Sequence, residues 1–64
     1  MTETTDPRIV ALARACAYLE AAYDETEDDK YYTAYLETSH AALLLTDAET
    51  FEAAVAEAKR EIRS

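Results

Sequence analysis

The sequence predicts an all-α protein, a compact bundle of three helices in a single domain. The chain has 64 residues, no glycine and one proline, and it is rich in the strong helix formers alanine, glutamate, leucine and arginine. Valine and isoleucine are scarce, and no hairpin dipeptide such as Asn-Gly occurs. Apolar residues recur with helical spacing in three segments, at about 7–23, 29–45 and 47–63. Residues 1–64 therefore form one domain, near the lower size limit for independent folding.

The first helix is expected over about 7–23. Asp6-Pro7 is a helix start, because the aspartate caps free N–H groups and proline suits the first helical position. A narrow apolar stripe with spacings of three and four residues follows. The stripe consists of Ile9, Leu12, Cys16, Leu19 and Tyr23. Ala13 and Ala17 flank it and allow a neighbouring helix to approach closely. Residues 1–5 are expected to be a mobile polar tail.

The second helix, at about 29–45, has a broad apolar face. One row contains Tyr32, Leu36, Ser39 and Leu43, and the adjacent row contains Tyr35, Thr38, Ala42 and Leu45. This is more apolar surface than one partner helix covers, so a second contact, with a homodimer as one possibility, is expected.

The third helix, at about 47–63, follows a capping box, Thr46-Asp47-Ala48-Glu49. Its inner face contains Phe51, Ala54, Val55, Ala58 and Ile62. The preceding turn contains no glycine, so one long bent helix spanning both segments is the alternative. The stripes together predict Leu12, Leu19, Leu36 and Phe51 as core residues whose truncation would unfold the domain.

The net charge of −8 excludes some partners and favours others. It repels nucleic-acid phosphates and anionic lipid surfaces, and it attracts a basic protein surface. Two other interpretations remain open: charge for solubility, and adaptation to high salt, which the presence of only two lysines also fits. No apolar run is long enough to span a membrane, and the start of the chain lacks the pattern of a signal peptide. A cytoplasmic protein is expected.

The acid-rich run at residues 24–29 is the most distinctive part of the chain. Five of its six residues are acids, and all five tyrosines lie within seven residues of it. Asp28 or Asp29 can cap the second helix, but acids directly after the first helix oppose its dipole. Acids steer a basic protein and pair with it, and tyrosines supply rigid contact area. The predicted protein-binding residues are Asp24, Glu25, Glu27, Asp28, Asp29, Tyr31 and Tyr35.

No set of residues predicts an enzyme or a cofactor. A chain without glycine has no phosphate-binding glycine loop. Cys16 lies on an apolar stripe and is expected to be buried and inert. Glu37 and His40, however, have the Glu-x-x-His spacing of helical di-iron sites. The alternative hypothesis is therefore a metal-binding helical oligomer that uses Glu37, His40 and Glu20.

In general character the chain resembles small phage-encoded inhibitors, such as anti-CRISPR proteins, and antitoxins, since it is short, acidic and without catalytic residues. This resemblance implies a non-enzymatic protein–protein interaction module. Its acidic run would mimic nucleic acid and occupy a basic, nucleic-acid-binding surface on another protein, without binding nucleic acid directly.

Overall fold

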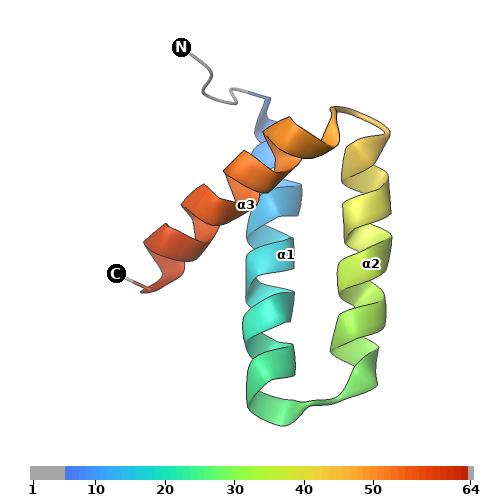
Figure 1. Cartoon of the computed structure of the whole chain (residues 1–64), viewed down its shortest axis with the longest axis vertical. Helices are drawn as coiled ribbons and strands as arrows, with labels where there is room; N and C mark the ends of the chain where they lie inside the picture. Colours follow the sequence, from blue (N-terminus) through green and yellow to red (C-terminus); the bar gives the residue numbers. More distant parts are fainter. Residues whose placement is uncertain (1–5, 64) are drawn as a thin grey trace.

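The protein folds as three α-helices, with no strand among the residues described (Figure 1). The computed structural model describes residues 6–63; the expected tail at residues 1–5 lies outside them. The helices are α1 (Pro7–Thr26), α2 (Asp29–Leu43) and α3 (Ala48–Arg63). The prediction of an all-α, three-helix fold is confirmed. No helix of the described part is long and apolar enough to cross a membrane.

Helix α1 begins as predicted but continues three residues beyond the predicted end. The Asp6 carboxylate accepts a hydrogen bond from the Arg8 backbone N–H at 2.9 Å, and Pro7 is the first helical residue. At the other end, α1 includes Asp24, Glu25 and Thr26. The first half of the acidic run is therefore the last helical turn rather than a loop.

The cap of α3 lies one residue later than the predicted capping box. The Asp47 carbonyl accepts the first helical hydrogen bond, from Phe51 N at 3.1 Å. Hydrogen bonding from Thr50 holds the pKa of the Asp47 carboxyl below its usual value. Thr46 is not itself the cap; its hydroxyl donates a hydrogen bond to the Asp47 carboxylate at 3.3 Å. Because α2 ends at Leu43 and a turn precedes α3, the alternative of one long bent helix is wrong.

Helix α1 is the centre of the fold, and both other helices pack against it (Figure 1). Helices α2 and α3 touch each other only near the turn that joins them and then diverge. Among the described side chains, two ion pairs connect α1 to α3: Arg14 with Glu61, at 2.8 Å, and Glu20 with Lys59. Because α2 and α3 both pack on α1 and diverge from each other, the molecule is flat, with extents of 36 × 28 × 17 Å.

The core is small and rich in alanine. Its buried members are Ile9, Ala13, Cys16, Ala17, Ala42, Phe51, Val55 and Ala58. The flanking alanines of the predicted stripe lie at its centre, because α1 contacts neighbours on two sides; Leu12 packs at the margin. Phe51 is buried as predicted. The prediction of Leu36 as a core residue is wrong, since its side chain is 40 % exposed.

Candidate functional site

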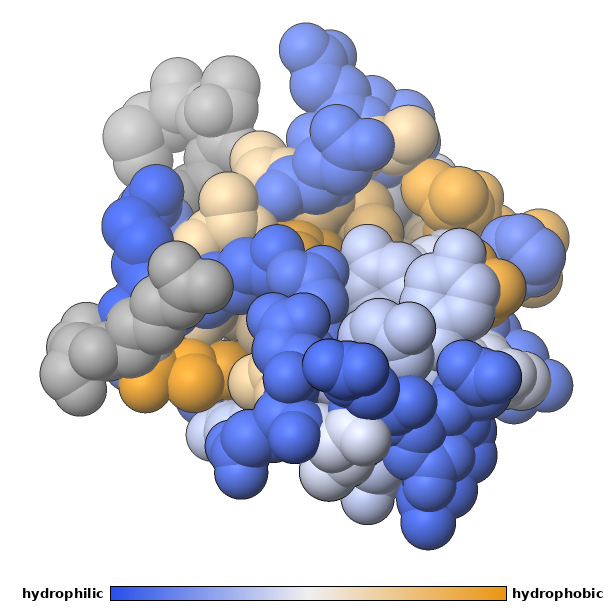
Figure 2. All heavy atoms as spheres, turned by 60° about the horizontal axis from the view of Figure 1, so that its bottom comes forward, coloured by the Kyte–Doolittle hydropathy of each residue, from blue (hydrophilic) through white to orange (hydrophobic). Residues whose placement is uncertain are grey.

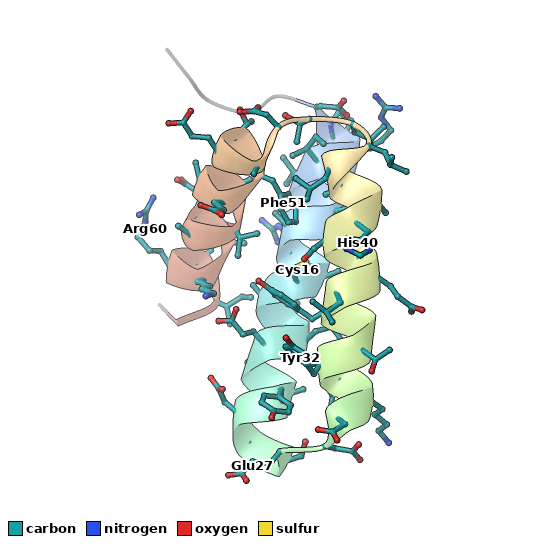
Figure 3. All side chains as sticks on the ribbon, turned by 45° about the vertical axis from the view of Figure 1, so that its right-hand side comes forward. Cys16, Glu27, Tyr32, His40, Phe51 and Arg60 are labelled. Atoms are coloured by element: carbon teal, nitrogen blue, oxygen red, sulfur yellow. The ribbon has the colours of Figure 1, made fainter. Side chains whose placement is uncertain are left out.

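The acidic run surrounds the turn between α1 and α2, at one end of the molecule. Figure 2 brings this end forward and shows hydrophilic surface gathered there. All five acids are exposed: Asp24 and Glu25 in the last turn of α1, Glu27 and Asp28 in the connection, and Asp29 at the start of α2. The Glu27 side chain points away from the helices (Figure 3). The structure therefore brings these five predicted residues together as one surface, here called the acidic end.

The acidic end is almost without neutralising partners. Among the side chains that the structure describes, only Lys30 pairs with it, at 3.8 Å from Asp28. The other described basic side chains pair with acids elsewhere. These pairs are Arg8 with Asp6, Arg14 with Glu61, Lys59 with Glu20 and Arg60 with Glu57. Asp24, Glu25 and Glu27 thus lie beside the negative end of α1 with no basic partner among the described side chains. Asp29 also has no such partner, but it lies at the positive end of α2.

Local folding explains part of this arrangement. The Asp28 carboxylate caps α2 by accepting a hydrogen bond from Lys30 N at 3.0 Å. Glu27 ends α1 in the left-handed conformation, with φ at 56°, and donates its backbone N–H to Tyr23 O at 2.6 Å. This position favours glycine or asparagine, because a larger side chain makes the left-handed conformation costly. Folding therefore accounts for Asp28 but not for a glutamate at position 27.

Replacing Glu27 by glycine is expected to raise the free energy of unfolding by about 0.5–1 kcal/mol. The relief of the left-handed conformation outweighs the greater freedom of glycine in the unfolded chain. Urea denaturation of Glu27→Gly and Glu27→Gln separates this backbone effect from the loss of charge. In the matched control Glu25→Gly, the same change lies inside α1 and should lower stability by about 1 kcal/mol. Equal effects at the two positions would contradict the assigned cap.

The tyrosines divide between two surfaces. Tyr31 is partly buried at the start of α2, and the Lys30 ammonium lies 5.3 Å from the centre of its ring. Tyr32 is half exposed and packs its ring against Tyr23, with centroids 5.9 Å apart. Tyr35 lies one turn further along α2 and packs against the core. Of the two predicted tyrosines, only Tyr31 therefore belongs to the acidic end.

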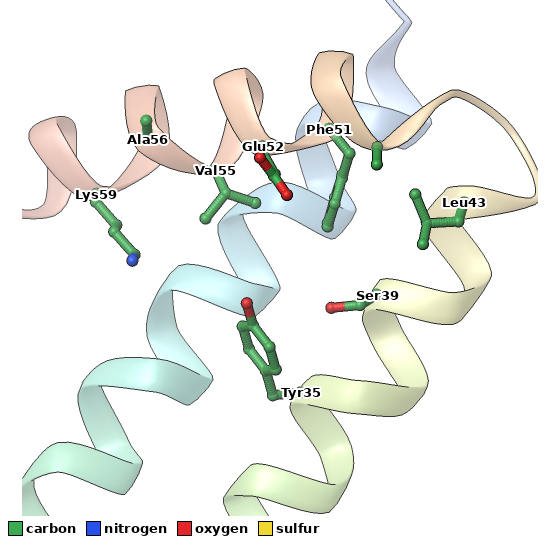
Figure 4. Close-up of a pocket in the computed structure, with 9 residues that line it drawn as sticks. Tyr35, Ser39, Leu43, Phe51, Glu52, Val55, Ala56 and Lys59 are labelled. Atoms are coloured by element: carbon green, nitrogen blue, oxygen red, sulfur yellow. The ribbon is translucent and has the colours of Figure 1, made fainter.

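Tyr35 instead lines an apolar groove between α2 and α3. The groove has a volume of about 380 Å³, and Figure 4 shows the Tyr35 ring rising into it with the hydroxyl toward α3. Its lining residues are Tyr35, Ser39, Leu43, Ala48, Phe51, Glu52, Val55, Ala56 and Lys59. The α2 wall of the groove could be anticipated from the broad apolar face of that helix in the sequence. The α3 wall could not be predicted, because it depends on α3 diverging from α2.

The three residues of the metal-binding alternative do not meet. Glu20 faces α3, where it pairs with Lys59, whereas Glu37 and His40 are exposed on α2. No group of three or more potential metal ligands forms within the described residues.

Cys16 is fully buried, and burial raises the pKa of its thiol. Its sulfur lies 3.7 Å from Ser39 Oγ, between α1 and α2. A protonated thiol in such a position is a packing group rather than a nucleophile.

Comparison with protein-family models, curated proteins and solved structures finds no match to this chain. Its function has to be inferred from its own residues.

Proposed function

We propose that this protein is a non-enzymatic interaction module whose acidic end binds a basic, nucleic-acid-binding surface on another protein. One observation carries the proposal: of the five exposed carboxylates in residues 24–29, only that of Asp28 has a basic partner among the described side chains. A surface that binds phosphates also accepts carboxylates, because both form charge-assisted hydrogen bonds with arginine and lysine. The protein would then act in the cytoplasm as a small inhibitor that mimics nucleic acid.

The shape of the acidic end suits this role. It protrudes at the far end of the α1–α2 hairpin, where a partner can approach without meeting α3 (Figure 1). The concentrated charge would steer the encounter, and the carboxylates would then pair with cations of the partner. Tyr31, beside Lys30, supplies an aromatic ring next to the acids on which an arginine can stack.

The triple variant Glu25→Gln, Glu27→Gln and Asp28→Asn is expected to associate with the basic partner at least about tenfold more slowly at low ionic strength. The dependence of the association rate on salt should also become shallower, since steering acts mainly on the encounter. Asparagine caps a helix as well as aspartate does, so α2 should keep its start. The partner is first identified by affinity capture and mass spectrometry, and the rates are then measured by stopped-flow fluorescence.

The matched control is Glu37→Gln, Glu49→Gln and Glu57→Gln, which removes the same charge from exposed acids outside the acidic end. It should bind with nearly wild-type kinetics. Equal slowing in both variants would mean that net charge alone matters, and the acidic end would not be the binding site. Wild-type kinetics in the first variant would also reject the proposal.

A further inference from the structure

We draw no further inference here: the strongest candidate, the apolar groove between α2 and α3 with the exposed leucines of α2 beside it, carries none, because nothing in the structure shows what covers it.

Discussion

Replacing Phe51 by alanine is expected to remove the cooperative thermal unfolding of the protein. Phe51 is 5 % exposed and is the largest side chain in a core otherwise made of Ile9, Val55, Cys16 and alanines. Truncating a buried phenylalanine costs about 3–5 kcal/mol. A domain of this size has only about 3–10 kcal/mol of total stability, so one such loss takes most of it.

Circular dichroism during heating, at a fixed protein concentration, measures this effect. Tyr18→Ala is the matched control, because Tyr18 is a similar aromatic residue of α1 that is 59 % exposed. It should melt within a few degrees of the wild type, as surface substitutions usually do. If Phe51→Ala kept the wild-type melting temperature, the packing of α3 on α1 described above would be incorrect.

The three helices were predictable because their signals are local. Composition, the Asp6-Pro7 start and the 3–4 spacing of apolar residues depend only on neighbours in the chain. The end of α1 was not predictable in this way. Its last turn is stabilised by the Thr26 hydroxyl, which donates to Ala22 O at 2.9 Å, and by the left-handed cap at Glu27. Propensity and dipole arguments oppose acids there, yet Asp24 and Glu25 lie in a helical turn with exposed side chains.

The burial of individual residues was harder to predict than the helices. The helical stripe placed Leu36 in the core, because an apolar row normally faces a neighbour. In the structure α3 diverges from α2. Its direction depends on how its side chains pack on the alanine-rich surface of α1, which the spacing of residues in the sequence does not reveal. Tyr35 was assigned to the acidic site by proximity in sequence, but one helical turn places it in the groove. The five acids lie at one end of the molecule because they fall within six adjacent residues, 24–29.

The close contact of α1 with α2 leads to the second large expected effect. Ala13, Cys16 and Ala42 are fully buried, so the helices meet across small side chains. In Ala13→Leu, three additional carbon atoms would enter a space already filled. Overpacking of this kind costs about 1–3 kcal/mol, and here it would also push α1 away from its neighbours in the core.

Ala13→Leu should therefore lower the urea midpoint strongly, whereas Ala11→Leu should leave it nearly unchanged. Ala11 is exposed on α1, and leucine is almost as good a helix former as alanine, so the two variants differ only in the space available. Hydrogen exchange is a second measurement of the same effect. In Ala13→Leu the loss of close packing should make backbone amides of both α1 and α2 exchange faster than in the wild type. If Ala13→Leu were as stable as Ala11→Leu, α1 and α2 would not be in close contact at Ala13. The tightly packed core described above would then be incorrect.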